Sequence, residues 1–313
     1  MATLPADFSL QNVKGIKESF DNAMNVTIDM FSDVPFVDMY RTDEIFEIYT
    51  STEDLTGSKE LGVLETPPSN GMQDGYSTTI TESRYGNAIL LPESVWRRYQ
   101  NDGSTKVPVF LNREKNKLLM DLKNLLVTDL HLFLNDAFTG TTLLSPDGQP
   151  LLDTAHTWKT PGASTFDNTD TQALDSAAID TMETYAGAFT GPGGKPQPIN
   201  FDTIIVKKGS AAAREAIRLF AQQITPTAVN DINIYYGQYK IVETPYITTA
   251  IQWFAYASDA GQENACKLGI GEAPTLREPT REENEAIRIN CTGFWKKGIV
   301  NMPYMWYGST GTT

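Results

Sequence analysis

The chain has 313 residues, of which 40% are hydrophobic and 20% are charged, a composition typical of folded proteins. This length allows one or two domains with a substantial core. The net charge of −14 and the pI near 4.6 argue against tight nucleic-acid binding through a broad basic face, because an acidic surface repels phosphates.

Targeting signals and membrane spans are not expected. The N-terminal residues MATLPADFSLQ lack the basic start and apolar run of a signal peptide, and no stretch approaches the ~18 apolar residues of a membrane span. Cys266 and Cys291 are the only cysteines in the sequence. We expect both to be reduced, buried thiols, because disulfides are rare in proteins that are not secreted.

Residues 1–43 mix short apolar patches with charges and are predicted to form an extended arm that docks through Phe31, Phe36 and Tyr40. Two strand-like runs follow, at 44–50 and 76–89, with a polar, glycine-dotted stretch between them. On the second run, alternation places one set of side chains on each face: Thr78, Ile80, Glu82 and Arg84 on one, and Thr79, Thr81 and Ser83 on the other. Neither face is strongly apolar. A ribbon of two such strands is marginal alone, so we expect it to gain order on a neighbouring copy.

The strongest helical pattern covers residues 113–138. One apolar stripe recurs at steps of three and four, formed by Leu119, Leu122, Leu126, Leu130, Phe133 and Ala137. Asn112 is the expected N-cap, and Gly140 lies just past the end. A helix of about 26 residues would be ~39 Å long, which predicts a structural strut.

The second half of the chain alternates irregularly between helices and strands. We predict a helix that begins near Asp170 or Thr171, a buried strand over 201–208, and a helix capped by Ser210. Two strands are expected around Gly237, another over 251–258, and a β-rich C-terminal tail. No βαβ repeat is present, so the predicted class is α+β.

No motif predicts catalysis, a cofactor or a metal. In GPGGKP, Phe189 replaces the first glycine of a phosphate loop and Pro196 replaces its hydroxyl residue, so a turn is expected. Gly269 and Gly271 lack the third glycine of a dinucleotide fingerprint, because Pro274 stands there.

The titratable groups have plain structural interpretations too. His131 is expected on a flank of the long helix. His156 beside Asp153 is the stronger candidate for chemistry, although no G-x-S-x-G or zinc spacing accompanies it. The acid pairs at 43–44 and 282–283 are expected to be solvated or to face basic patches across an interface.

Several segments, in order, resemble the major head proteins of tailed phages, particularly the Mu-type head subunit. They are LLDTAHTW with the helix ALDSAAIDTMETYAGAF, then NFDTIIVKKGSAAAREAIRLF, INIYYGQYKIVETPYI, IQWFAYAS and the ending NCTGFWKKGIVNMPYMWYGSTGT. The resemblance covers residues 110–313, and the first third fits by layout. Each motif is weak alone, and their order carries the resemblance.

The resemblance implies the Hong Kong 97 fold. Its parts would be an N-terminal arm (1–43), an extended β-hairpin loop (44–95), a peripheral domain with a spine helix (96–175), an axial domain (176–265), and a return strand to the peripheral domain with a C-terminal tail (266–313). Contacts between subunits would involve loop residues, namely Lys59, Leu61, Val63, Leu64, Tyr76, Ile80 and Arg84. Lys59 is the only lysine in the loop, and no partner for a crosslink is identified.

The function so implied is a major capsid protein that assembles as hexamers and pentamers into an icosahedral shell around double-stranded DNA, which it encloses without reading its sequence. The implied location is the virion, assembled in the bacterial host cytoplasm, with portal, scaffold and protease partners. The main alternative is an encapsulin-type cellular compartment with the same fold. A soluble hydrolase using His156 and Asp153, and a tail or decoration subunit, are further alternatives.

Overall fold

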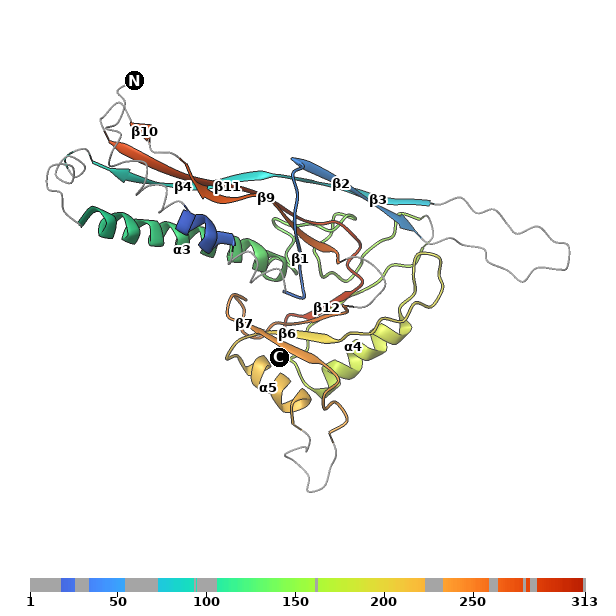
Figure 1. Cartoon of the computed structure of the whole chain (residues 1–313). Coiled ribbons are helices and arrows are strands. Elements are labelled where there is room, and N and C mark those ends of the chain that lie inside the picture. Colours follow the sequence, from blue (N-terminus) through green and yellow to red (C-terminus); the bar gives the residue numbers. More distant parts are fainter. Residues whose placement is uncertain are drawn as a thin grey trace.

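The computed structural model describes residues 18–25, 34–53, 73–92, 94, 106–160, 163–222, 233–258, 264–277, 280–281 and 286–311. Within them the chain combines helices with three sheets, which confirms the α+β class. Figure 1 shows an elongated upper sheet with a long helix along its lower side, a second sheet below, and a two-stranded ribbon that projects at one end.

The upper sheet brings together strands from three distant parts of the sequence. It contains β1 (Asp38–Arg41), β9 (Cys266–Leu276), β11 (Ile287–Ile299) and β10 (Thr280–Arg281) in that order, and β4 (Ser83–Leu91) also pairs with β11. β1 runs parallel to β9, whereas the other pairs are antiparallel. The long β11 is therefore the strand on which the sheet is organised.

Helix α3 (Lys106–Asn135) lies along the lower face of this sheet (Figure 1). Its 30 residues make it ~45 Å long. The apolar stripe predicted from the sequence is confirmed, since Leu122, Leu126, Leu130 and Phe133 are all buried. At its N-terminal half the helix shares a small core with residues 18–25 and the sheet, made of Phe20, Met24, Leu91, Leu118, Leu122, Leu276, Ile287, Ile289 and Cys291.

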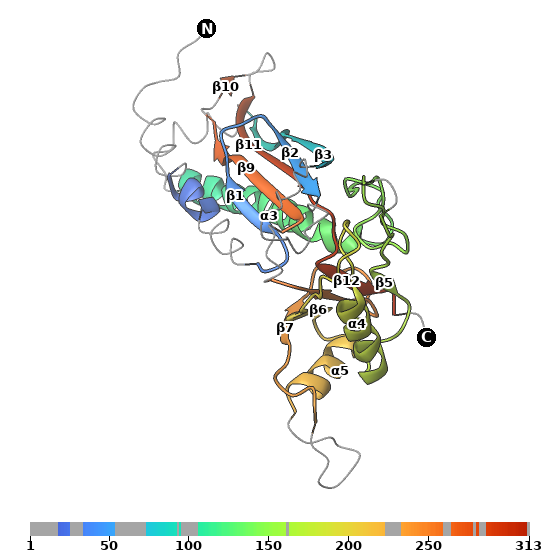
Figure 2. The same ribbon diagram turned by 90° about the vertical axis from the view of Figure 1, so that its right-hand side faces the viewer.

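The lower sheet has the order β5-β12-β8-β6-β7. Its strands are β5 (Thr169–Asp170), β12 (Trp306–Ser309), β8 (Trp253–Tyr256), β6 (Thr203–Lys207) and β7 (Lys240–Thr244). Helices α4 (Ser176–Ala188) and α5 (Ala211–Phe220) cover its side away from α3 (Figures 1 and 2). As predicted, Ser210 caps α5, and its Oγ accepts a hydrogen bond from the Ala213 amide.

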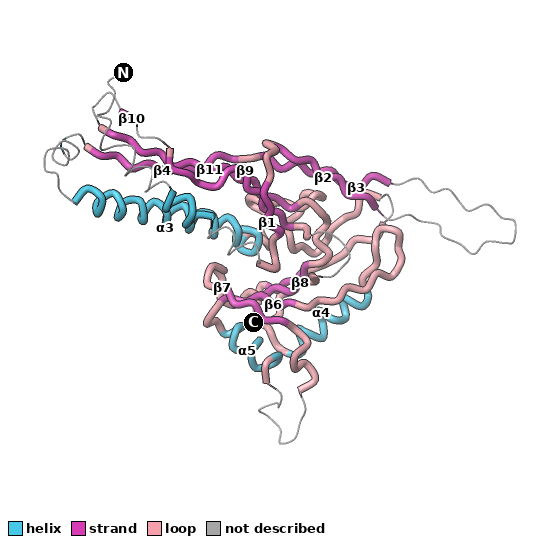
Figure 3. The backbone as a smooth tube through the Cα atoms, in the orientation of Figure 1, coloured by secondary structure: helices cyan, strands magenta, loops and turns pink. Residues whose placement is uncertain are grey.

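One continuous core joins the two sheets. It contains Leu130 and Phe133 of α3 together with Trp295 of the upper sheet and Trp253 and Trp306 of the lower sheet. The C-terminal half of α3 therefore packs against both layers, and the tube view shows it entering the space between them (Figure 3). Cys266 and Cys291 are free, buried thiols, as expected.

Several predicted boundaries are wrong. α3 begins at Lys106, so Asn112 lies inside the helix and is not its N-cap; Pro108 falls in the first turn, where its missing N–H costs nothing. α4 begins at Ser176 with Asp175 as its cap, because residues 169–170 pair with β12 instead.

The strand predicted just before Gly237 does not form. The Asn233 side chain donates to the carbonyl of Leu219 in the last turn of α5 and to that of Gln222 just after it, and residues 234–238 follow as turns. A local side-chain bond therefore outweighs the strand propensity of the sequence Ile234-Tyr235-Tyr236.

The run predicted over 76–89 is two strands. β3 (Gln73–Thr81) pairs with β2 (Phe46–Glu53) to form the ribbon, whereas β4 leaves it after Glu82 and pairs with β11. The expected ribbon over 44–95 is thus shorter. The C-terminal tail also divides, since β9 and β11 join the upper sheet as expected but β12 joins the lower one.

No helix in the described part of the chain is long and apolar enough to span a bilayer.

Truncating Leu130 tests the shared core. Leu130→Ala is expected to lower the free energy of unfolding by about 2–5 kcal/mol, because the side chain is fully buried between layers that cannot collapse easily. Urea denaturation measures this loss. Met120→Ala, on the exposed face of the same helix, is the control and should change stability by less than about 0.5 kcal/mol. Equal losses for the two variants would contradict this description of the core.

Candidate functional site

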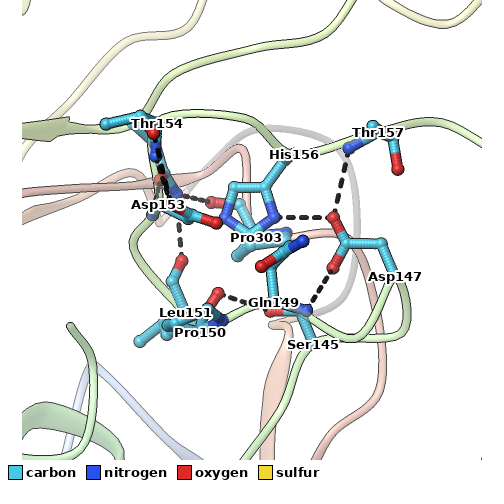
Figure 4. A network of polar contacts seen from close by, with 11 residues as sticks. Ser145, Asp147, Gln149, Pro150, Leu151, Asp153, Thr154, His156, Thr157 and Pro303 are labelled. Carbon is cyan, nitrogen blue, oxygen red and sulfur yellow. Dashed lines mark hydrogen bonds and ion pairs between the residues drawn. The ribbon is translucent and has the colours of Figure 1, made fainter. Parts of the chain in front are cut away.

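His156, the strongest candidate for chemistry in the sequence, is a buried structural residue. Its side chain has no exposed surface, its Nδ1 lies 2.9 Å from Asp147 Oδ2, and its ring stacks on Phe166 (Figure 4). Burial by itself would raise the pKa of Asp147, but hydrogen bonds from His156 and from the Gln149 and Thr157 amides outweigh it and lower the pKa. A His–Asp pair with no exposed surface offers no path for a substrate.

The expected pairing of His156 with Asp153 is wrong. Asp153 Oδ1 instead accepts from the Thr154 amide, and the Asp153 amide donates to Asn168 Oδ1 (Figure 4). The Asp153 side chain therefore shapes its own turn. The hydrolase hypothesis loses the acid on which it depended.

His131 also serves the fold. Its Nδ1 donates to the Val127 carbonyl and its Nε2 accepts from Thr244 Oγ1, both at 2.8 Å, so it ties α3 to the end of β7. Burial lowers the pKa of His131. No group of three or more His, Cys, Asp or Glu side chains within the described ranges could hold a metal ion. The GPGGKP segment is the expected turn, closed by a bridge between Thr190 and Pro196.

One face of the ribbon of β2 and β3 carries exposed apolar side chains that no other described residue covers. Phe46, Ile48 and Thr50 of β2 stand opposite Thr81, Thr79 and Ser77 of β3 and share its outer face. Phe46 is 58% and Ile48 is 61% exposed, and Ile45 beside them is 67% exposed. Exposed apolar residues grouped in this way mark a surface for interaction. The expectation that neither ribbon face is apolar is therefore wrong for the outer face.

The inner face of the ribbon packs on its own chain. Ile80 is 4% exposed and lies over Gly298 of β11, where a Cβ atom would come within 2.2 Å of Ile80 Cγ2. Gly269 of β9 similarly makes room for the Tyr40 ring. The Gly269–Gly271 pair that lacks a nucleotide fingerprint thus has a steric role: Gly269 leaves room for Tyr40 of the paired strand β1, and Gly271 leaves room for the Glu82 side chain.

A buried polar network fixes the ribbon at its root. The ammonium group of Lys296, a residue with no exposed side-chain surface, lies 2.6 Å from Glu47 Oε1 and also donates to the Glu44 carbonyl at 2.7 Å. Thr42 Oγ1 donates to Glu47 Oε1 at 2.6 Å, and Tyr40 donates to Oε2 at 2.5 Å. The Tyr49 hydroxyl donates to the same Oε2. β1, β2 and β11 therefore meet at one carboxylate.

The protonation equilibria reflect this network. Burial by itself would raise the pKa of Glu47, but the bonds from the Lys296 ammonium and three hydroxyl groups outweigh it and lower the pKa to about 2. The pKa of Tyr40 is raised by burial and by its bond to the Glu47 carboxylate. Glu47 is therefore ionised throughout the neutral range, as is required to compensate a buried lysine.

A second tether holds the far strand of the ribbon. Lys159, in the loop that follows His156, donates from Nζ to the Gly75 carbonyl at 2.9 Å.

On the opposite side of β11 from the ribbon, Trp295 Nε1 donates to Asp129 Oδ2 of α3 at 2.7 Å, and the Lys297 ammonium pairs with Oδ1. Three consecutive residues of one strand thus connect the ribbon above to the helix below.

The contact residues predicted from the sequence differ in where they lie and in how exposed they are. Lys59, Leu61, Val63 and Leu64 lie outside the described residues. Arg84 is exposed on β4, and Tyr76 is half-buried against the main core. Ile80 differs from the prediction, since its side chain is buried in its own chain and is not available to a neighbour. The sequence analysis did not identify Glu47 or Lys296 as functional. The only indication it offered was that each charged residue lies among apolar residues in a predicted strand.

Comparison with solved structures gives matches that cover most or all of the chain. A structure of Mycobacterium phage Patience matches with a TM-score of 0.55 at 13% identity, covering 100% of this chain and 92% of the other. The capsid of Myoviridae phage XM1 (TM-score 0.45, 9% identity, 87% and 89% covered) and a virus-like particle from Pyrococcus furiosus (TM-score 0.44, 11% identity, 93% and 98% covered) also match. No family model matches the sequence, and no curated protein matches it either. The likeness to the Mycobacterium phage Patience structure shows a shared fold, in agreement with the resemblance to phage proteins found in the sequence.

Acid should weaken the ribbon root through Glu47. A carboxyl whose pKa is lower in the folded than in the unfolded chain contributes stability above its ordinary value of 4.5, and this contribution disappears as the pH falls toward about 2. The stability difference between the native chain and Glu47→Gln should therefore shrink between about pH 6 and about pH 3. Urea unfolding of both proteins across this range measures the difference. A constant difference would show that Glu47 is not the ionised partner of Lys296.

Proposed function

We propose that this chain is the major capsid protein of a tailed bacteriophage, a subunit whose copies assemble into a closed icosahedral shell. The observation that carries the proposal is the outer face of the ribbon. It presents Phe46 and Ile48 on an element that projects from the body, and no described residue of the same chain covers them. A second copy of the chain would supply the missing surface.

The proposal assigns the parts of the Hong Kong 97 fold to the observed elements. The ribbon and the residues between its strands would form the extended loop, and α3 with the upper sheet would form the peripheral domain and its spine. The lower sheet with α4 and α5 would form the axial domain. In this assignment β4 belongs to the peripheral domain and β5 and β12 to the axial domain, because these strands pair there. Residues 1–43 would be the N-terminal arm, although Phe36 and β1 are built into the body.

Assembly in such a shell would rest on many weak contacts. Each ribbon contributes a small apolar area, but a subunit that both offers a ribbon and receives one makes several contacts at once, which multiplies their effect. The role is therefore structural and not enzymatic, and the buried His156–Asp147 pair stabilises the fold. Hexamers and pentamers, and the portal, scaffold and protease partners, are carried by the resemblance alone.

The proposed content of the shell is double-stranded DNA. With a net charge of −14, the subunit is not suited to binding phosphates tightly, so the DNA would be enclosed without sequence-specific binding. Nuclease-treated particles from producing cells should contain protected duplex DNA. Particles that contain a packaged enzyme and no DNA would instead establish a cellular compartment with the same fold.

Polar substitutions on the outer ribbon face should separate folding from assembly. Phe46→Thr with Ile48→Thr is expected to leave the unfolding midpoint unchanged, because both side chains are exposed and threonine suits a strand. The concentration needed for assembly should rise at least about tenfold, since each large apolar side chain buried at an interface contributes about 1.5–3 kcal/mol.

Sedimentation velocity and negative-stain electron microscopy of the purified chain measure this change. Met120→Ala, which also alters an exposed apolar side chain but on α3, is the matched control and should assemble normally. Closed shells of normal size from the ribbon variant at the native threshold would remove the observation on which the proposal rests.

A further inference from the structure

The direction in which the ribbon leaves the sheet is a separate structural problem from its stability. Its apolar contacts with the body, Ile80 over Gly298 and Tyr76 against the main core, are non-directional. A two-stranded ribbon has little cooperativity of its own to fix its register. Some other interaction has to select one direction.

The Lys296–Glu47 pair is such an interaction. Lys296 has 0% and Glu47 has 13% of its side chain exposed, and their charged atoms are 2.6 Å apart. Any shift of the ribbon by one step would leave a buried lysine without its counter-charge, which is strongly unfavourable. Buried charge pairs of this kind add little net stability compared with apolar residues of the same volume, but they penalise alternative arrangements.

The remaining contacts fix the position of the ribbon relative to β1 and α3. Tyr40 of β1 and Thr42 hold the same carboxylate from a second side, so two different segments constrain Glu47. On the other face of β11, Trp295 and Lys297 are bound to Asp129 of α3. The strand that carries Lys296 is thus itself fixed to the long helix.

We infer that Glu47 and Lys296 are positioning residues that set the direction of the ribbon relative to α3, so that its outer face meets a second copy at one angle. The inference rests on the proposed function for its consequence, a uniform shell. The predicted effect on the order of the ribbon within a single chain is independent of the proposed function.

The test replaces both charges at once. Glu47→Gln with Lys296→Met keeps a side-chain acceptor for the three hydroxyl groups and removes the buried charge with its partner. The unfolding midpoint is expected to stay within a few degrees of the native value, because a neutral pair of similar volume substitutes well for a buried ion pair. Hydrogen exchange at the amides of 46–50 and 77–81 should become at least about tenfold faster, while β6 amides are unchanged. Particles should become heterogeneous in size or fail to close.

The matched control is Glu272→Gln with Arg277→Met, a neutralised pair at the end of β9, which pairs with β11 in the same sheet. It should leave exchange in the ribbon unchanged, whereas a general loosening of the sheet would raise it. Native exchange in the ribbon of the Glu47→Gln/Lys296→Met variant would overturn the inference, and so would uniform shells of native size from it. If the native chain forms no shells at all, the proposed function fails, whereas the exchange comparison still decides whether the pair positions the ribbon.

Discussion

The buried ammonium group of Lys296 is the constraint around which the upper half of this molecule is organised. A lysine without exposed surface requires an anion and further acceptors, and here they come from Glu47 and from the carbonyl of Glu44. Both belong to the segment that leads into the ribbon. The requirement of one charge therefore decides where the ribbon leaves the body, while Gly298 makes room for Ile80 beneath it and Gly269 makes room for the Tyr40 ring.

This arrangement gives the two faces of the ribbon different tasks. The inner face is polar at its centre and is fully committed to its own chain, whereas the outer face is simpler and carries Phe46 and Ile48 among threonines. The inner contacts already order the ribbon, so its apolar outer face would lose little further conformational freedom when a partner binds. Such pre-organisation suits a subunit that repeats one contact many times.

The histidines show how burial separates structure from chemistry. His156 with Asp147 has the composition of a catalytic pair, and His131 with Thr244 has the composition of a relay, yet both histidines are buried. His156 Nδ1 is held by Asp147, and both ring nitrogens of His131 are hydrogen-bonded. In each case the hydrogen bonds join segments that the chain has to hold together: the 147–157 turn, and α3 with β7.

Periodic and local signals in the sequence determined the long helix and its stripe, the Ser210 cap, the buried strand before it, and the α+β class, because these depend on side chains close in the chain. The sequence also indicated a ribbon that is marginal alone. Only the tertiary structure decided that the run 76–89 divides between two sheets, that Ile80 points inward, and that Glu47 meets Lys296 across 249 positions of sequence. Spacing within a strand says which residues share a face, but not which distant charge lies opposite, since that follows from the packing of layers that are far apart in the chain.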